Sequence, residues 1–419
     1  VLPILTKILK NFKNYSIITC GGIMYKIEKL DHKGRGITFV DNKITFVENA
    51  LKDEIVDIRI LNQKKKFNEA KVLSIITESV DRVTPICPYY KDCGGCNLMH
   101  LKYEKQLEYK KEKVSEILKR YGNLEISIDS IQSTSCLNYR NKVTLQVKKG
   151  LGFYKDNTYD IVEIDHCDIV EPRINEVIES LKNEDLSGIY QIVIRVSCDE
   201  VMVVFKTNED LKLDLEQLKV DTIIMYKDGN YKTVKGKGYI TETLENLKFI
   251  VSPDSFFQVN TTGALLLYNQ VLEYASLTEN ENVLDLFCGT GTIGMFLSRK
   301  AKKVIGVEIN QYAIEDAKKN AEMNGVSNIE FICDDATNVK LNGIDVVVVD
   351  PPRSGLNPKI IEYLLNLKSK KIIYVSCDPM TLARDLKSLQ DGYDVKEVSL
   401  VDMFPNTYHV ETVCVLEKK

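Results

Sequence analysis

The chain has 419 residues, a length that accommodates roughly two to four domains. Hydrophobic residues make up 44% and charged residues 28% of the sequence, which excludes a disordered or collagen-like chain. No apolar run approaches the roughly 18 residues that a membrane-spanning helix needs, so no membrane partner is expected. The eleven cysteines are too sparse for a secreted disulfide scaffold. We therefore expect a cytoplasmic protein.

Charge is distributed unevenly along the chain, although the formal net charge is only −4. Residues 1–167 contain 28 Lys and Arg against 21 Asp and Glu, whereas residues 168–419 contain 28 against 39. This asymmetry predicts that the first part meets a polyanion and that the second part has another task.

The first 23 residues lack a clear pattern. Lys7, Lys10 and Lys13 interrupt their apolar stretch, which argues against a signal peptide. Met24 stands directly before the first well-patterned run. We expect Met24 to be the native start and residues 1–23 to be a non-native extension.

Residues 24–80 contain short runs of β-forming residues, separated by turns such as Asp41–Asn42. Several short strands within about 50 residues predict a small barrel of the OB type, a fold that commonly binds oligonucleotides. The runs are 36–40, 43–46, 55–61 and 71–76.

Residues 81–260 are predicted to form a central, β-rich α+β domain. A cluster of Cys, Pro and Gly is followed by a helical pattern over 101–121, and Gly122 is its predicted stop. β-branched runs such as 142–147 and 191–205 predict strands after this helix.

Residues 261–419 are predicted to form an α/β domain, because strand and helix patterns alternate from about Val283 onward. Such alternation is typical of a parallel sheet with helices on both faces, which binds ligands at the carboxyl ends of its strands. The predicted strands are 283–287, 303–307, 329–332, 344–349 and 371–375, and the predicted helices lie near 292–300, 311–323, 358–365 and 380–389.

A glycine-rich turn links the first of these strands to its helix. It starts at Asp285 and includes Gly289 and Gly291, which let the backbone approach a ligand closely. Glu308 ends the next strand, 17 residues beyond Gly291, where a carboxylate can accept hydrogen bonds from ribose hydroxyls. A dinucleotide site would look similar. The fourth strand ends in Asp350-Pro-Pro-Arg, which argues against a dinucleotide site.

This set of motifs resembles the class I (Rossmann-like) S-adenosylmethionine-dependent methyltransferases. The resemblance implies that Asp285, the glycine turn, Glu308 and Asp350 contact the cofactor. Cys377 follows the fifth strand in Ser-Cys-Asp-Pro, at the carboxyl edge of the sheet and close to a helix amino terminus. That position is expected to favour the thiolate.

Longer motifs narrow the resemblance. Asp350-Pro-Pro-Arg, Ser-Cys377-Asp-Pro, His409-Val-Glu-Thr-Val, Ser252-Pro-x-Ser-Phe-Phe-Gln-Val-Asn and Asn138-Tyr-Arg-Asn-Lys resemble the RNA 5-methyluridine (uracil-C5) methyltransferases, whose barrel is called a TRAM domain. The resemblance implies transfer of a methyl group from S-adenosylmethionine to C5 of a uridine in RNA.

The same resemblance assigns roles to individual residues. Cys377 is implied as the nucleophile that adds to uracil C6, and Glu411 as the base that removes the C5 proton. The residues implied to hold S-adenosylmethionine are Gln258, Phe287, Glu308 and Asp350. A uridine can reach such a pocket only when it is unpaired or flipped out of its stack. Phe256, Phe257 and Phe287 are candidates to pack on the base or on the adenine.

Three cysteines lie within ten residues, at 87, 93 and 96, and Cys167 can complete a set of four. Four thiolates suit either zinc or an iron–sulfur cluster, and spacing alone does not distinguish the two metals. A subset of the methyltransferase family carries a [4Fe–4S] cluster, and the resemblance implies this cluster on Cys87, Cys93, Cys96 and Cys167.

RNA is the expected partner, and a monomer is expected. The barrel and the four cysteines resemble the 23S rRNA-modifying members, while tRNA stays open as the alternative substrate. A small-molecule or protein methyltransferase would have no use for Cys377 with Glu411. A non-catalytic iron–sulfur RNA-binding module would need intact catalytic motifs to be vestigial. Candidate phosphate contacts are Lys26, Lys29, Lys33, Arg35, Lys64–Lys66, Arg140 and Lys142.

Overall fold

The computed structural model describes residues 16–19, 22–128, 130–156, 158–210 and 218–419. The chain divides into two compact units. Unit 1 comprises residues 1–91, 95–113 and 406–408, and unit 2 comprises 92–94, 114–405 and 409–419. The expected division into three domains with boundaries near residues 80 and 260 stays a prediction. Most of the expected amino-terminal extension, including Cys20, lies outside the described residues.

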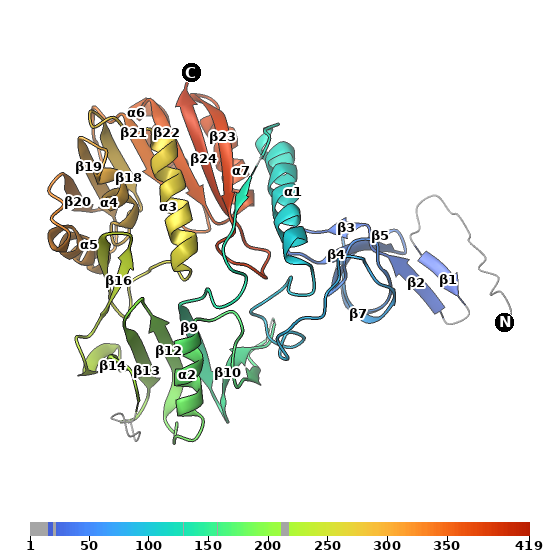
Figure 1. Cartoon of the computed structure of the whole chain (residues 1–419). Coiled ribbons are helices and arrows are strands. Elements are labelled where there is room, and N and C mark those ends of the chain that lie inside the picture. Colours follow the sequence, from blue (N-terminus) through green and yellow to red (C-terminus); the bar gives the residue numbers. More distant parts are fainter. Residues whose placement is uncertain (1–15, 20–21, 129, 157, 211–217) are drawn as a thin grey trace. The chain divides into compact units, whose positions relative to one another are not determined.

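Unit 1 contains a seven-stranded sheet that corresponds to the predicted barrel (Figure 1). Asp41 and Asn42 both adopt a positive φ between β4 and β5, as a tight hairpin turn requires. Ile27, Val47, Ala50, Val56 and Ala70 form the buried core. In sheet order the strands are β1 (Ser16–Thr19), β2 (Gly22–Lys26), β6 (Ile55–Gln63), β7 (Asn68–Thr77), β5 (Lys43–Glu48), β4 (Gly36–Val40) and β3 (Lys29–Leu30).

Unit 1 also holds two segments that are distant in sequence from its sheet. The backbone N–H groups of Asn97 and Leu98 both donate to the carbonyl of Asn406, at 2.9 Å. Gln106 exchanges two hydrogen bonds with Asn406, one to its side chain at 3.1 Å and one from its backbone N–H at 3.0 Å. Residues 406–408 are therefore an integral part of this unit.

The central part of unit 2 is a second seven-stranded sheet. The expected single run over 191–205 is two strands, β12 and β13, because the chain turns back at residues 197–200. Helix α2 (Pro172–Leu181) buries one side of its surface beside β12 and was not predicted. In sheet order the strands are β11 (Ile161–Glu163), β10 (Leu151–Tyr154), β9 (Lys142–Val147), β12 (Ile189–Val196), β13 (Val201–Thr207), β14 (Thr222–Lys227) and β15 (Asn230–Lys235).

A hairpin of β16 (Ile240–Leu244) and β17 (Leu247–Val251) connects this sheet to the last part of the chain. The loop 252–259 follows it and leads into α3 (Thr261–Ala275). The side chain of Asn260 accepts a hydrogen bond from the N–H of Gly263 at 2.9 Å and so caps α3.

An eight-stranded sheet forms the rest of unit 2. The predicted alternation is confirmed, since β18 to β22 are parallel and helices connect most of them. The last two long strands are antiparallel. In sheet order the strands are β20 (Ile329–Cys333), β19 (Lys303–Glu308), β18 (Asn282–Leu286), β21 (Val346–Val349), β22 (Lys371–Ser376), β24 (Glu411–Lys418), β23 (Tyr393–Val401) and β8 (Ile131–Gln132).

Helices cover both faces of the eight-stranded sheet (Figure 1). Residues of α3 and α4 (Thr292–Ser298) pack in one core cluster. Residues of α1 (Tyr103–Gly122), α6 (Pro358–Leu367) and α7 (Pro379–Leu389) pack in the other. The remaining helix is α5 (Gln311–Met323). This arrangement leaves the carboxyl ends of the parallel strands for functional residues.

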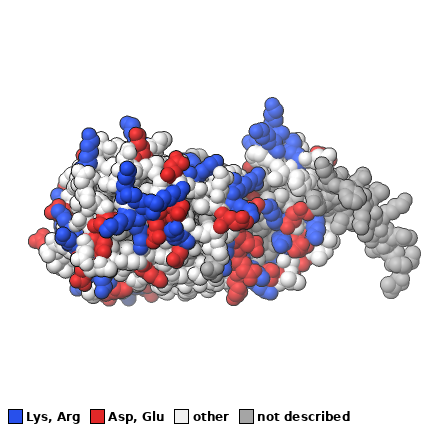
Figure 2. All heavy atoms as spheres, turned by 90° about the horizontal axis from the view of Figure 1, so that it is seen from above, with Lys and Arg blue, Asp and Glu red and all other residues white. Residues whose placement is uncertain are grey.

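The surface seen in Figure 2 mixes the two signs of charge, with Lys and Arg side chains next to Asp and Glu side chains. Within the described ranges, no helix combines the length and apolar composition needed to cross a membrane.

Candidate active site

The glycine turn after β18 opens space at the carboxyl edge of the eight-stranded sheet. Gly289 has φ +53°, and a Cβ added there would meet nothing within 4 Å. Gly291 caps α4 at φ +79°, and a Cβ there would lie 2.7 Å from the ring of Phe331. Both positions therefore require glycine, one beside open space and one against a packed ring.

Asp285, at the end of β18, is a fully buried carboxyl group. The backbone N–H of Gly294 lies close enough to favour its charged form, but no described side chain donates a hydrogen bond to either oxygen. Burial and the nearby charges of Asp350 and Glu308 raise its pKa to about 8. A buried acid that no side chain compensates is costly, so its environment favours a cationic or hydrogen-bond-donating ligand.

Two further acids stand at neighbouring strand ends. Glu308, at the end of β19, accepts hydrogen bonds from the N–H groups of Gly289 at 3.3 Å and Asn310 at 2.9 Å. Asp350 follows β21, and burial raises its pKa to about 7. Burial, then the charges of Asp350, Asp285 and Glu411, also raises the pKa of Tyr268 of α3. These acids therefore share one region.

The acids fit the expected cofactor. S-adenosylmethionine carries a sulfonium, an ammonium and two ribose hydroxyls, which can be held by buried carboxylates and by an acid at the end of the second strand. Glu308 has the position expected for the ribose, while Asp285 and Asp350 are carboxyl groups that form no ion pair with a described residue, so a cationic ligand would favour their charged forms.

Cys377 follows β22 directly, and Asp378 caps the helix that begins behind it. The side chain of Asp378 accepts hydrogen bonds from the N–H groups of Met380 at 2.8 Å and Thr381 at 3.2 Å. Because Asp378 occupies these helix donors, they do not serve the thiol. Burial and the charge of Glu411 raise the pKa of Cys377 to about 11. The expectation that the helix terminus favours the thiolate is therefore wrong, because burial outweighs any such effect.

Glu411 is the first residue of β24, and only 4% of it is exposed. Burial, followed by the charge of Asp350, raises its pKa to about 8, while Arg353 acts in the opposite direction. Arg353 also lowers the pKa of Cys377. One cation thus acts on both candidate catalytic groups.

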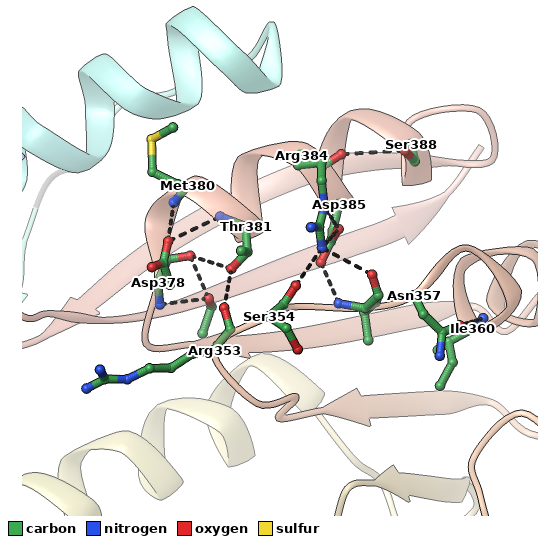
Figure 3. A network of polar contacts seen from close by, with 12 residues as sticks. Arg353, Ser354, Asn357, Ile360, Asp378, Met380, Thr381, Arg384, Asp385 and Ser388 are labelled. Atoms are coloured by element: carbon green, nitrogen blue, oxygen red, sulfur yellow. Dashed lines mark hydrogen bonds and ion pairs between the residues drawn. The ribbon is translucent and has the colours of Figure 1, made fainter. Parts of the chain in front are cut away.

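Side chains of α7 hold the loop that carries Arg353 (Figure 3). The Arg384 guanidinium donates to the carbonyls of Ser354 at 2.9 Å and Leu356 at 3.1 Å. The Thr381 hydroxyl donates to the carbonyl of Arg353 at 3.3 Å. The Arg353 side chain extends away from these contacts in Figure 3.

Asp385 completes this network from a fully buried position. One of its oxygens accepts hydrogen bonds from the N–H of Leu356 and from the hydroxyl of Tyr374, both at 2.7 Å. The other accepts from Arg384 at 2.8 Å. A Cβ at Gly355, which has φ +72°, would lie only 2.5 Å from Asp385, so the network requires glycine there.

The loop 252–259 presents two neighbouring phenylalanines differently. Phe256 is 73% exposed, whereas Phe257 is buried in the core. Gln258 is buried, and its carbonyl accepts a hydrogen bond from the Asn141 side chain at 3.3 Å. Phe287 adopts φ +64°, an unfavourable conformation for a bulky residue, at the entrance to the glycine turn.

The four cysteines expected to bind a metal are all partly exposed, unlike the buried Cys288 and Cys414. In the described part of the chain, no group of three or more His, Cys, Asp or Glu side chains is arranged as a metal site. The expected cluster therefore stays a prediction from the sequence.

Some functional contacts were not predicted. Arg353 belongs to a motif that was recognised, but its action on both Cys377 and Glu411 depends on tertiary structure. The roles of Arg384 and Asp385 had no sequence signal, because a charged pair on an amphipathic helix is usually solvent-exposed.

Comparisons with known proteins agree with this geometry. Residues 102–419 match the model of the tRNA (Uracil-5-)-methyltransferase family, and residues 26–73 match the TRAM domain. A protein named as an uncharacterized RNA methyltransferase from Clostridium acetobutylicum is 40% identical, over 94% of this chain and 96% of the relative. One with the same description from Halalkalibacterium halodurans is 38% identical, over 94% and 96%.

A solved structure is also similar over nearly the whole chain. It is the Pyrococcus abyssi tRNA (uracil-54, C5)-methyltransferase in complex with S-adenosyl-L-homocysteine. The TM-score is 0.79 and the sequence identity 31%, with 94% of this chain and 100% of that chain covered.

Proposed function

Because the chain belongs to the family of S-adenosylmethionine-dependent RNA (uracil-5-)-methyltransferases, we propose that it methylates C5 of a specific uridine, in 23S rRNA, through a covalent bond to Cys377. The observation that carries this proposal is the grouping of Cys377, Glu411 and Arg353 beside Asp285 and Asp350. A methyltransferase acting on a stronger nucleophile would not need this thiol and acid.

Uracil C5 is a weak nucleophile, and Cys377 solves this problem. Its thiolate adds to C6, which turns the ring into an enolate with electron density at C5. S-adenosylmethionine, when bound, supplies the electrophilic methyl group. Arg353 is placed to stabilise negative charge on the thiolate, because it lowers the pKa of Cys377. We propose that Asp285, Gly289, Gly291, Glu308, Asp350, Gln258 and Phe287 form the cofactor site.

Glu411 completes the reaction. After methyl transfer, C5 carries both a hydrogen and a methyl group, and Glu411 as carboxylate removes the proton. The electron pair of the C5–H bond re-forms the C5=C6 double bond, and the thiolate leaves C6. Because its pKa is raised to about 8, Glu411 binds a proton more strongly than an ordinary carboxylate once it has been deprotonated.

Phe256 is proposed to pack on the target uracil. A large aromatic ring that is 73% exposed, two residues before the proposed cofactor residue Gln258, provides a face for a base taken out of its stack. Phe257 serves as an internal comparison, since its ring belongs to the core.

Two variants test the catalytic assignment. Cys377→Ala should bind S-adenosylmethionine normally but form neither 5-methyluridine nor a covalent adduct with 5-fluorouridine RNA. Glu411→Gln should form the methylated covalent adduct and fail to release it, which a gel shift under denaturing conditions detects. Turnover by either variant at the wild-type rate would refute the assignment.

The preference for 23S rRNA over tRNA rests on the sequence resemblance. Transfer RNA is the alternative substrate. The structurally similar P. abyssi enzyme is a tRNA (uracil-54, C5)-methyltransferase. Mapping of 5-methyluridine in both RNAs from a deletion strain distinguishes the two. Loss from 23S rRNA alone supports the proposal, and loss from tRNA alone contradicts it. Both RNAs are found in the cytoplasm, where we place the enzyme as a monomer.

We also propose that Cys87, Cys93, Cys96 and Cys167 hold a [4Fe–4S] cluster with a structural role. The donor set fits, because four partly exposed thiols are the usual ligands of such a cluster. Anaerobically purified protein should absorb near 400 nm and contain about four iron and four sulfide per chain. Colourless protein with one zinc per chain would refute the cluster.

A further inference from the structure

Four basic side chains gather on the central sheet and its border. Lys142 of β9 lies directly opposite Arg195 of β12. Lys206 of β13 lies opposite Gln191, which shares a sheet face with Arg195 because side chains alternate along a strand. Arg140 precedes β9, and Arg140, Arg195 and Lys206 all act on Lys142.

The basic group is poorly neutralised. Within the described ranges, none of its four members forms an ion pair with an acid. Two carboxyl groups lie in electrostatic range, Asp254 near Lys142 and Glu242 near Arg195. Asp254 already accepts a hydrogen bond from the Tyr231 hydroxyl at 2.9 Å. Burial, followed by the charges of Arg195, Lys206 and Arg140, lowers the pKa of Lys142 to about 8, while Asp254 acts in the opposite direction.

One member of the group links it to the proposed base site. Arg195 is buried and donates to the carbonyls of Ser255 at 3.2 Å and Phe257 at 2.8 Å. These two residues flank the exposed Phe256. Arg195 is therefore a positioning residue for the loop. Lys142 lies opposite Arg195 and in electrostatic range of Asp254 of the same loop, so it connects the other cations of the group to this loop.

We propose that Arg140, Lys142 and Lys206 bind the phosphodiester backbone of the RNA strand next to the target uridine. The inference rests on the proposed function, because it takes RNA as the substrate and Phe256 as the base platform. A base that leaves its stack brings its own and adjacent phosphates to the mouth of the site. Three convergent cations would hold these phosphates and release their counterions.

Salt dependence of RNA binding tests the site. Lys206→Ala should weaken binding of an in vitro-transcribed substrate RNA about fivefold and reduce the slope of log affinity against log salt by about 1. Adding Lys142→Ala should reduce it by about 1 more. Lys232→Ala is the matched control. Lys232 is an exposed lysine of β15 and lies on the sheet face opposite to Tyr231, whereas Lys206 shares the face of Tyr231. S-adenosylmethionine affinity, measured by calorimetry, should not change.

A second probe makes the test specific. RNA with neutral methylphosphonate linkages flanking the uridine should lose affinity for the wild-type enzyme but not for Lys142→Ala/Lys206→Ala. If the double variant folds poorly, Lys206→Glu alone gives the same comparison. The site would be refuted if Lys206→Ala had the same salt slope as Lys232→Ala. It would also be refuted if the double substitution lowered the affinity for the methylphosphonate RNA as much as for the unmodified RNA. Because these experiments measure binding without turnover, a failure of the proposed phosphate site can be distinguished from a failure of the proposed methylation.

Discussion

At the scale of single residues, burial favours the protonated forms of both candidate catalytic groups. Burial raises the pKa of Cys377 to about 11 and that of Glu411 to about 8. A thiol is inert until its proton leaves, so substrate binding has to change its surroundings. Arg353 already favours loss of this proton, because its positive charge lowers the pKa of Cys377.

Alkylation of Cys377 by iodoacetamide should therefore accelerate steadily from pH 7 to pH 10, because the thiolate fraction grows until the pH reaches the pKa. Arg353→Gln should slow alkylation at each pH, since its removal raises the pKa of Cys377 further. Peptide mass spectrometry measures Cys377 separately from the exposed Cys198 and Cys333. Arg120→Gln, which changes an exposed arginine of α1, is the control. A rate that is constant above pH 8 would contradict the raised pKa.

At the scale of elements, α7 does two things. Its first residues follow Cys377, and its second turn holds the loop 353–356 through Arg384 and Asp385. Cys377, the proposed nucleophile, and Arg353 are thus attached to the same helix, which fixes one relative to the other.

Asp385→Asn should disturb this attachment, because an amide replaces a charged acceptor of three hydrogen bonds. We expect a loss of roughly 1–3 kcal/mol in the free energy of unfolding, measured with urea. The variant should also lower kcat while S-adenosylmethionine affinity stays unchanged. Lys387→Ala changes an exposed residue of the same helix and should alter neither quantity. An unchanged kcat in Asp385→Asn would show that the helix only stabilises the fold.

The elements also show what sequence reasoning could reach. The parallel strands β18 to β22 and their helices were predictable, because long apolar runs alternate with amphipathic ones. Helix α2 and the break at residues 197–200 were not, since a short amphipathic helix and a tight turn leave weak patterns. The acids at the strand ends could be named from motifs. The raised pKa of Cys377 could not, because it depends on tertiary neighbours.

At the scale of the whole molecule, RNA recognition is expected to involve the barrel as well as the catalytic part. The TRAM domain spans residues 26–73, and Lys64, Lys65 and Lys66 are exposed between β6 and β7. Three adjacent, solvated cations suit phosphate contacts that add affinity without reading sequence.

Replacing Lys64–Lys66 with alanine should weaken RNA binding and lower the salt slope by roughly 2–3, because up to three phosphate contacts are lost. S-adenosylmethionine binding should be unaffected. The control replaces Lys302, Lys368 and Lys418, three exposed lysines at the sheet edge opposite Cys377. Filter binding over a range of potassium chloride concentrations measures both slopes. Equal slopes for the two triple variants would argue against a role of the barrel.

The three discontinuous segments of unit 1 have a consequence for biosynthesis. Asn97, Leu98 and Gln106 form hydrogen bonds with Asn406, about 300 residues later in the chain. The barrel strands can pair while the ribosome is still translating, but unit 1 cannot be completed until residues 406–408 have emerged. Glu411 follows three residues after that segment, so the last folding step of this unit coincides with the arrival of the proposed base. Nascent chains that stop short of it would remain both incompletely folded and without that base.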